Sequence, residues 1–447
     1  MRRTQVFVVL LALMVAATSA WAQGFGVYEQ SACALGRGGA TVAAPCDDGS
    51  SIFFNPAGIG RATGMQISFG GSIINPRGDF TGDAGTSGSL QSRFYQVPNM
   101  YLVVPVRKVV FGVGLFAPYG LTTDWPLNFE GRFLGYKTSV KGVYLQPTIA
   151  YKVNDKVSIG GGVDVTYASL ELNQRVDLSS QLLNATTTFA AIGVPVGTDF
   201  ANVKLSGNAW RVGFNLGFQA KPSDRMSVGA RYLSRQNFDI SNGQFVPFQV
   251  PTSLLLPITL SATLPKGTPI DLMVRPQFTG PNALAVQKAT TSITFPDQFV
   301  AGTAIDVAKN TRLFADYIFT HWALFDQIAI TRQFVTTPTV LTENYNNTHG
   351  VRLGVEHQLR PDLTLRGGFV AHTAAAPDTT VTPLLPEGSR REFSGGLGVK
   401  LVNHMHADVY YMYLMQGDRR GRTQVGVNNG TYTFMSHLFG ITLTAGF

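Results

Sequence analysis

Short and long connecting segments alternate along the whole of this sequence, and this rhythm constrains its fold more than any other feature. Links of about two residues, such as Asn154-Asp155, take turns with links of a dozen residues or more. Antiparallel barrels of the bacterial outer membrane have short periplasmic turns and long external loops, a rhythm that β-sandwiches rarely keep. The sequence therefore predicts an all-β fold, a transmembrane antiparallel β-barrel of about 14 strands.

The segments between these links alternate apolar and polar residues, as a strand between lipid and a lumen requires. Trp210, Val212 and Phe214, for example, interleave with Arg211 and Gly213. A periplasmic β-sandwich would alternate too, so the links carry more weight than the alternation. The expected strands span residues 64–75, 92–105, 109–120, 137–153, 156–176, 203–221, 224–241, 293–308, 310–331, 347–360, 363–373, 391–402, 404–416 and 433–447. The long links lie near residues 76–91, 121–136, 177–202, 242–292, 332–346, 374–390 and 417–432.

Composition supports a membrane strand protein. Only 14% of the residues are charged, against about a quarter in an ordinary soluble domain. After the N-terminal residues, the sequence has no run of eighteen apolar residues, so helical membrane spans are not expected. The net charge of +8 comes without a basic helix or a lysine run, and no nucleic-acid partner is expected.

The first residues have the pattern of a secretory signal peptide. Arg2 and Arg3 precede a short apolar stretch, and Ala20-Trp21-Ala22 fits an A-x-A cleavage site. We therefore expect a signal peptide over residues 1–22 and a mature chain that begins at Gln23. An uncleaved N-terminal anchor is the alternative.

The sequence ends inside an alternating segment, and its last residue is Phe447. A terminal Phe after such a strand resembles the recognition signal of bacterial outer-membrane barrels. It predicts insertion by the barrel assembly machinery into the outer membrane of a Gram-negative bacterium. Outer-membrane lipids and lipopolysaccharide would then surround residues 62–447 as a transmembrane β-barrel, which we expect to be a monomer.

Two segments do not fit a simple barrel. Residues 23–61 lack sustained alternation and are long enough to fold back as an N-terminal hatch, or plug. They contain Cys33 and Cys46, which in an exported chain indicate a disulfide, with free buried thiols as the alternative. The link 242–292 is unusually apolar, and such patches often mark binding sites, although they also pack on neighbouring loops or lipid. Its candidate ligand-binding residues are Phe245, Phe248, Leu254 and Leu256.

Several motifs resemble the FadL family of outer-membrane transporters, which includes hydrocarbon importers of the TodX type. The resemblance covers nearly all of the mature chain. Its N-terminal part consists of Gly24-Phe25, Glu29-Gln30-Ser31, Leu35-Gly36, Asp47-Asp48 and Asn55-Pro56-Ala57. Its later part consists of Val97-Pro98-Asn99-Met100, Tyr119-Gly120-Leu121, Phe295-Pro296-Asp297, and Pro386 with Arg390.

The resemblance implies a barrel of fourteen strands plugged by its N-terminal hatch, which takes up long-chain fatty acids or hydrocarbons by passive diffusion. Ligand would collect between the external loops near 177–202 and 242–292 and then enter a pocket that the mature N-terminus, with Gly24 and Phe25, also reaches. It would leave sideways through a gap at an inward kink of the third strand. By the same resemblance, the residues that frame this gap are Asn55, Pro56, Ala57 and Gly120.

The sequence departs from fatty-acid-specific members at positions that hold the ligand carboxylate. Ala117-Pro118 stands where those members carry a hydroxyl, and Asn346-Asn347 stands where they carry Lys. Arg175 falls within one position of the family's Arg and is the best carboxylate partner, or else a charge at the external rim. These departures argue against a strict preference for fatty acids and leave room for neutral hydrocarbons.

Other functions find less support. The sequence has no Gly-x-Ser-x-Gly elbow and no matched set of catalytic residues, so no enzyme activity and no cofactor are expected. His404 and His406 form a His-x-His pair without a further ligand, so no metal site is expected. A general or substrate-specific aqueous porin is the main alternative, and it would need an open polar lumen. A structural or adhesive barrel, with the apolar loops as contact surfaces, is another.

Overall fold

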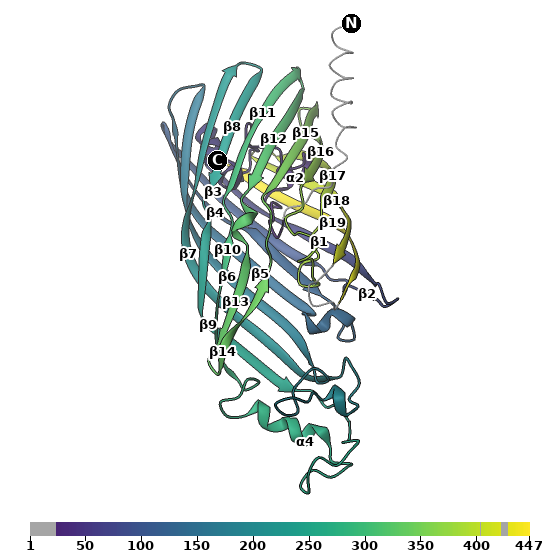
Figure 1. The fold of residues 1–447 in the computed structure, drawn as a ribbon. Helices are drawn as coiled ribbons and strands as arrows, with labels where there is room; N and C mark the ends of the chain where they lie inside the picture. The colour runs from purple at the N-terminus through teal and green to yellow at the C-terminus, as the bar shows by residue number, and fades with distance from the viewer. Residues whose placement is uncertain (1–23, 403, 422–427) are drawn as a thin grey trace.

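The computed structural model describes residues 24–402, 404–421 and 428–447. The expected signal peptide, its cleavage site and Gln23 lie outside these residues. The described chain forms one antiparallel sheet that closes on itself, because β1 pairs with both β3 and β19 (Figure 1). This confirms the predicted β-barrel with 14 strands.

Nineteen labelled strands make up the sheet, because three barrel strands are interrupted and two short strands, β2 and β14, extend hairpins. The strands are β1 (Gln66–Gly82), β2 (Ser87–Ser89), β3 (Tyr95–Val106), β4 (Val109–Asp124), β5 (Lys137–Lys152), β6 (Val157–Asp177), β7 (Asp199–Ser223), β8 (Met226–Leu233), β9 (Gln236–Gln249), β10 (Gln287–Phe295), β11 (Gln298–Ala308), β12 (Thr311–Thr320), β13 (Gln327–Arg332), β14 (Val335–Thr342), β15 (Thr348–Arg360), β16 (Leu363–His372), β17 (Arg390–Val402), β18 (Met405–Gly421) and β19 (Gly430–Gly446).

The helices are short, and among the described residues none is long and apolar enough to cross a membrane. The α-helices are α2 (Ala32–Gly36), α3 (Ser51–Phe54) and α4 (Ile270–Val274). The 3-10 helices are η1 (Pro56–Arg61), η2 (Glu130–Phe133), η3 (Ala190–Ile192), η4 (Arg275–Phe278) and η5 (Trp322–Leu324).

The alternation seen in the sequence separates the two faces of the wall. On β7, Val212 is 68% exposed on the outside, whereas Asn215 is fully buried on the inside. Tyr167 of β6 and Trp210 of β7 pair on the outer face, with ring centroids 5.1 Å apart. Beyond this pair the outward residues become polar, starting with Ser169. An aromatic pair at this position is typical of the girdle where a barrel leaves the hydrocarbon layer.

Three neighbouring barrel strands are broken at one level, which the sequence analysis did not predict. Breaks at 234–235, 296–297 and 321–326 divide β8 from β9, β10 from β11, and β12 from β13. They are adjacent because β8 pairs with β11 and β9 pairs with β10. Pro296 has no N–H to give to a ladder, and this favours a break at that position.

The external loops also differ in extent from the expected ones. β9 continues to Gln249 and β10 begins at Gln287, so the long apolar link is residues 250–286. Phe245 and Phe248 therefore lie on a strand. α4 lies in this link, at the end of the barrel opposite the short turns (Figure 1).

The N-terminal segment, residues 24–61, packs against the inner wall and is almost entirely buried. α2 contacts β16, β17 and β18, whereas η1 contacts β5, β6 and β7, so the segment reaches both sides of the barrel. Wall glycines permit this close approach. A Cβ added to Gly217 would lie 2.7 Å from the backbone nitrogen of Ala57, and one added to Gly368 would lie 2.1 Å from that of Gly38.

Candidate functional site

The wall is incomplete between β3 and β4. Their ladder runs from Val106–Val109 only to Met100–Leu115. Beyond it, residues 95–99 of β3 have β1 as their only strand partner, and residues 116 and 119–124 of β4 have β5 as their only strand partner. We call this unpaired stretch the wall gap.

A β-bulge directs β4 away from β3 where the gap begins. Phe116 pairs with Tyr144 and Tyr119 pairs with Gly142, so two residues of β4 face one residue of β5. The two residues of β4 at this point are Ala117 and Pro118, which lie opposite Val143 alone. A bulge bends its strand, and Pro118 cannot donate to a ladder, so the local sequence favours a kink here.

The N-terminal segment takes the place of the missing strand. The N–H of Val27 donates to the carbonyl of Pro118 at 2.8 Å, and the N–H of Gly120 donates to the carbonyl of Phe25 at 3.0 Å. The side-chain amide of Gln30 meets Ala117 as well, at 2.8 Å to its carbonyl and 3.3 Å from its N–H. Backbone groups that β3 leaves unpaired thus find partners in the N-terminal segment.

Phe25 sits in a cage of aromatic rings and is only 3% exposed. Its ring centroid lies 4.6 Å from that of Trp322, 5.4 Å from Phe325, 5.8 Å from Phe295 and 6.1 Å from Tyr119, each in an edge-on arrangement. Edge-on contacts are favourable between aromatic rings. Phe295, Trp322 and Phe325 come from the broken strands, so the breaks help to build this cage.

Gly24 is held by two charged residues that precede and begin β17. Its N–H donates to Oε1 of Glu387 at 3.0 Å, and its carbonyl accepts from Nη2 of Arg390 at 3.3 Å. Glu387 also accepts from the backbone N–H groups of Ala375 and Ala376. Burial raises the pKa of Glu387 above its ordinary value, and these N–H groups oppose the shift. The Pro386 and Arg390 motif was the only sequence signal for this anchor.

Two cavities meet at Phe25. The gap cavity, of about 530 Å³, lies at the wall gap, and the apolar cavity, of about 50 Å³, lies on the other side. Phe25, Leu121 and Val140 line both. The remaining residues of the apolar cavity are Thr138, Leu170, Leu172, Leu205, Ile293, Phe325, Ile328, Ile330, Leu341, Glu343, Tyr345, Leu384 and Leu385.

Glu343 is the one acid that lines the apolar cavity. It lies in the link between β14 and β15 and is 9% exposed. Burial raises its pKa to about 8. It is therefore neutral over most of the physiological range, and the cavity then carries no net charge from its lining.

Residues of the external loops and of the adjoining strand ends form an apolar cluster next to this cavity. Leu172, Leu205 and Ile330 belong to both. Of the four candidate ligand-binding residues from the predicted link 242–292, three lie in or against this cluster, and none of the four lines either cavity. Phe245 and Leu256 are buried in it, Leu254 packs against it while partly buried, and Phe248 is 55% exposed.

Arg175, near the end of β6, is largely buried with 12% of its side chain exposed. Its Nε lies 3.8 Å from Oδ2 of Asp199. Oδ1 of the same carboxylate accepts from Nε of Arg132 at 2.8 Å. Nε and Nη1 of Arg175 have no hydrogen-bond partner. The guanidinium therefore keeps donors free beside the cluster of the external loops.

The structure separates the candidate gate residues into two places. Gly120 lines the gap cavity together with Phe25. Asn55 instead donates to the carbonyls of Val42, at 2.6 Å, and Phe218, at 2.9 Å. Pro56 and Ala57 pack with it against β6 and β7, and none of the three lines the gap cavity.

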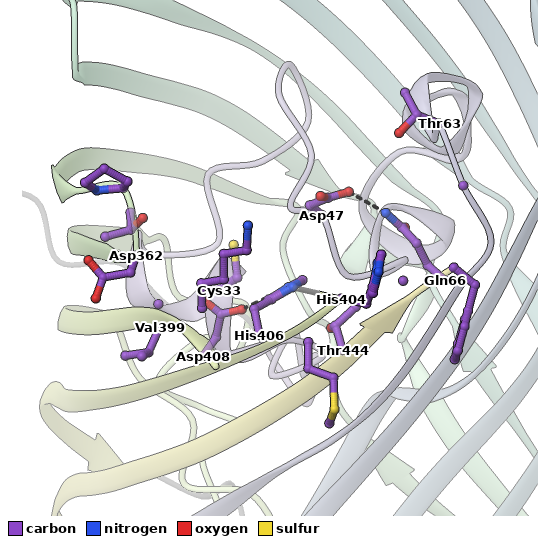
Figure 2. A pocket seen from close by; sticks show the side chains of 18 of the residues that line it. Cys33, Asp47, Thr63, Gln66, Asp362, Val399, His404, His406, Asp408 and Thr444 are labelled. Carbon is purple, nitrogen blue, oxygen red and sulfur yellow. Dashed lines mark hydrogen bonds and ion pairs between the residues drawn. The ribbon is translucent and has the colours of Figure 1, made fainter. Parts of the chain in front are cut away.

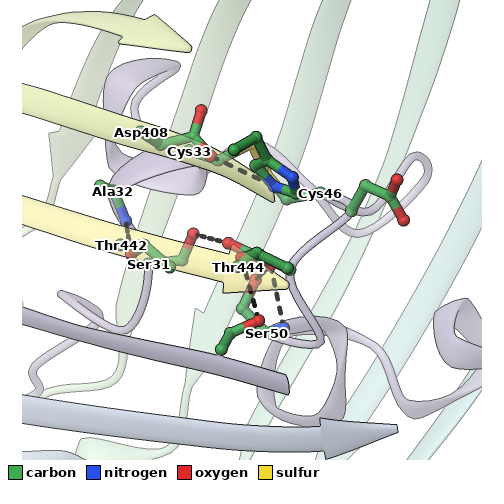
Figure 3. A network of polar contacts seen from close by, with 12 residues as sticks. Ser31, Ala32, Cys33, Cys46, Ser50, Asp408, Thr442 and Thr444 are labelled. Atoms are coloured by element: carbon green, nitrogen blue, oxygen red, sulfur yellow. Dashed lines mark hydrogen bonds and ion pairs between the residues drawn. A yellow bond between two sulfur atoms is a disulfide. The ribbon is translucent and has the colours of Figure 1, made fainter. Parts of the chain in front are cut away.

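Cys33 and Cys46 form a disulfide with a Cα–Cα distance of 6.2 Å. Figure 3 shows it within a polar network in which the N–H of Ala32 donates to Oγ1 of Thr442 at 2.9 Å. Ser31 also donates to Asp48. Asp48 lies close to both sulfur atoms, but bonded sulfurs have no thiolate to offer a metal.

A polar cavity of about 570 Å³ opens at the short-turn end, and Figure 2 shows His404, His406 and Asp408 in its lining. Nε2 of His406 lies 3.7 Å from Oδ2 of Asp408. Asp408 already binds Nη1 of Arg366 at 2.5 Å, which neutralises its charge. The His-x-His pair thus gains no free anionic ligand from this neighbour.

Comparison with known proteins identifies the family with which this chain aligns. Residues 13–447 match the family described as "Outer membrane protein transport protein (OMPP1/FadL/TodX)". Outer membrane protein P1 of Haemophilus influenzae is 25% identical, and the alignment covers 98% of both chains. The long-chain fatty acid transport protein of Escherichia coli K12 is 23% identical, over 98% of this chain and 97% of the relative.

Solved structures share the fold. A FadL homologue of Pseudomonas aeruginosa superposes with a TM-score of 0.80 at 19% identity, over 95% of this chain and 99% of the other. The toluene transporter TodX of Pseudomonas putida superposes with a TM-score of 0.68 at 16% identity, over 94% of this chain and 99% of the other.

Proposed function

This chain belongs to the OMPP1/FadL/TodX family of outer membrane transport proteins, and from that membership we propose how it moves its cargo. Long-chain fatty acids or hydrocarbons enter from the external loops and diffuse passively through the apolar cavity. They leave sideways through the wall gap. The family match and the relatives confirm the family and the outer-membrane location that the sequence predicted.

The observation that carries the proposal is the position of Phe25 between the two cavities. On one side, the apolar cavity shares residues with the cluster of the external loops. On the other side, the gap cavity reaches the wall gap between β3 and β4. Displacement of Phe25 would therefore join the external loops to the wall gap by a continuous apolar path.

Free energy supports this route. Each methylene moved from water to an apolar site gains about 0.8 kcal/mol, so the path can draw in a hydrocarbon chain without energy input. An aqueous pore offers no such gain. Transport of this kind requires binding groups and a movable segment but no catalytic residue or cofactor.

We propose that residues 24–30 are the moving part and that η1 holds the rest of the plug. These residues lie at the wall gap, where their hydrogen bonds to β4 occupy backbone groups that β3 leaves unpaired. Asn55, Pro56 and Ala57 would anchor the plug against β6 and β7. A bulky substitution at Ala57 should then abolish uptake by displacing the plug.

Arg175 is our candidate for the first carboxylate contact, with Phe245, Phe248, Leu254 and Leu256 around the hydrocarbon chain. Its free donors support this role. Arg175→Ala should weaken binding of a fatty acid and leave binding of an alkane unchanged. Equal losses for both ligands would show that Arg175 does not bind the carboxylate.

The test of the transport class compares uptake with conductance. Purified protein in a planar bilayer should show no large steady ionic current, whereas cells that express it should take up a labelled hydrocarbon. A large steady current without hydrocarbon uptake would instead identify an aqueous porin.

The remaining partners follow from the closing strand and the outer face. Phe447 directly follows β19, is 71% exposed, and would be recognised by the barrel assembly machinery. The outward polar residues beyond Tyr167 and Trp210 would meet lipopolysaccharide. We expect the chain to act as a monomer, since the whole path lies within one barrel.

A further inference from the structure

A polar cavity of about 270 Å³ lies between the N-terminal segment and the wall, and we call it the seat cavity. It shares no lining residue with the gap cavity or the apolar cavity. On the wall side it lies beside two short turns, because Lys221 precedes the β7–β8 turn and Arg312 follows the β11–β12 turn. The seat cavity is therefore at the periplasmic end of the barrel.

Three cations from three different elements line the seat cavity. Arg61 is the last residue of η1, Lys221 lies on β7 and Arg312 lies on β12. Each lies within electrostatic reach of the other two. Burial, and next the charge of Arg312, hold the pKa of Arg61 below its ordinary value. The fold thus brings like charges together, which costs free energy unless an anion offsets their repulsion.

The chain itself neutralises only part of this charge. Asp306 binds Arg312 through two hydrogen bonds, from Nε to Oδ1 at 2.6 Å and from Nη2 to Oδ2 at 2.9 Å. Asp47 borders the seat cavity as the one carboxylate in its lining. Within the described part of the chain, neither Arg61 nor Lys221 forms an ion pair with any carboxylate. Three cations therefore face two carboxylates, and the balance is positive.

Two buried hydroxyl groups add hydrogen-bond donors. Ser51 of α3 and Ser227 of β8 line the seat cavity and are 3% and 8% exposed. Among the residues that the structure describes, neither hydroxyl has a hydrogen-bond partner. Guanidinium, ammonium and hydroxyl groups are side-chain donors that bind phosphate oxygens. The lining thus combines positive charge with free donors, which is the chemistry of an oxyanion site.

We propose that the seat cavity binds a small multivalent oxyanion, inorganic phosphate or a phosphate monoester, between Arg61 of the N-terminal segment and Lys221 and Arg312 of the wall. The ion ties the segment to the wall at the end of η1. A doubly charged oxyanion matches this lining better than chloride does, because each of its oxygens can accept a separate donor. The inference is independent of the proposed ligand route.

The occupant is a free ion rather than the headgroup of a phospholipid. One side of the seat cavity is the N-terminal segment, which packs inside the barrel. A dissolved ion can reach this position from the periplasm, whereas a lipid that stays in the bilayer remains outside the wall. The two sources share the phosphate group, so the experiment separates them.

The test follows hydrogen exchange by mass spectrometry in the full chain, in nanodiscs of zwitterionic lipid. Inorganic phosphate should slow exchange over residues 57–62 several-fold and in a saturable way, and sodium chloride at the same ionic strength should not. Arg61→Gln and Lys221→Gln should each raise the half-saturating phosphate concentration by about ten-fold, as expected for loss of one charged hydrogen bond. Arg61→Lys should retain most of the affinity, because the positive charge remains.

Lys221→Gln is the decisive variant, since this exposed side chain has no bond to the N-terminal segment and the barrel should fold without it. Lys108→Gln, at an exposed turn lysine that does not line the seat cavity, is the matched control and should keep the affinity of the unmodified chain. The inference is overturned if phosphate gives no protection, if chloride protects equally, or if Lys221→Gln and Lys108→Gln respond alike. Protection by phosphatidylglycerol in the nanodisc, without added phosphate, would assign the effect to a lipid headgroup and would overturn it as well.

Discussion

The side chain of Gln30 bonds to both backbone groups of Ala117, accepting its N–H and donating to its carbonyl. One amide thus substitutes for a strand neighbour at the residue where β4 turns away from β3. Gln30→Ala would leave these groups unmet, a cost of about 1–3 kcal/mol when they stay buried. We expect faster hydrogen exchange at Val27 and Gly120, measured by mass spectrometry in nanodiscs. Gln358→Ala, at an exposed position of β15, should have no such effect, and slow exchange in both variants would contradict the link.

Phe25 should act as the partition between the two cavities. Phe25→Ala removes a ring from a packed cage, at a cost of about 3–5 kcal/mol in local packing. The loss should join the cavities and speed the exchange of a bound arene, followed by stopped-flow fluorescence. Phe218→Ala, on the outer face of β7, is the control and should leave the rate unchanged. Slower exchange in Phe25→Ala would show that Phe25 guides ligand rather than blocks it.

Glu343 should make binding of uncharged ligands depend on pH. Its pKa is about 8 in the folded chain against an ordinary value of 4.5, and burial is the cause. Protonated Glu343 therefore contributes stability to the folded state. This contribution is complete below about pH 4.5 and is lost as the pH rises through about 8. Hydrocarbon affinity should fall over the upper part of this range, because ionisation places a charge in the apolar cavity.

The check is a titration of ligand affinity and of urea unfolding between pH 5 and pH 9, for the unmodified chain and Glu343→Gln. The variant should show no fall around pH 8. A fall of the same size in both proteins would assign the dependence to another group.

The disulfide should stabilise the plug rather than the gate. Cys33 and Cys46 are 13 residues apart, and closing a loop of this size contributes about 3 kcal/mol on the chain-entropy model. The double variant Cys33→Ser with Cys46→Ser should show faster hydrogen exchange over residues 31–46 and retain most of its uptake. Complete loss of uptake in a variant that still inserts would show that the gate depends on this link.

Much of the barrel could be predicted from sequence because strand alternation and turn length are local properties. Residues 210–219 show the lipid-facing rhythm directly, and the structure places Val212 outside and Asn215 inside. The breaks within 224–241, 293–308 and 310–331 were missed. Pro296 is a local sign of one break, and the polar run 234–237 and the apolar run 322–325 interrupt the alternation at the other two.

The site was harder to predict because its parts come from distant segments. The cage around Phe25 joins residues separated by hundreds of positions, and no spacing rule links Phe25 to Trp322 or Phe325. Glu387 as the anchor of Gly24 was missed for the same reason. By contrast, the kink of β4 had a local signal in Ala117-Pro118, two residues before Gly120.

The most direct test of the transport route removes Pro118. One residue of β4 is in excess at the bulge, so this deletion restores one-for-one register with β5 and keeps Tyr119 facing inward. It also removes the one residue there that lacks an N–H, so that β4 can pair with β3 and close the wall gap. Deletion of Pro257, an exposed residue of the external link, is the matched control.

The measurement is uptake of a labelled fatty acid and a labelled arene by cells that express each variant at equal levels of folded barrel. Lateral exit predicts that deletion of Pro118 abolishes uptake of both ligands, while deletion of Pro257 leaves uptake near that of the unmodified chain. Undiminished uptake in a folded barrel without Pro118 would contradict exit through the wall.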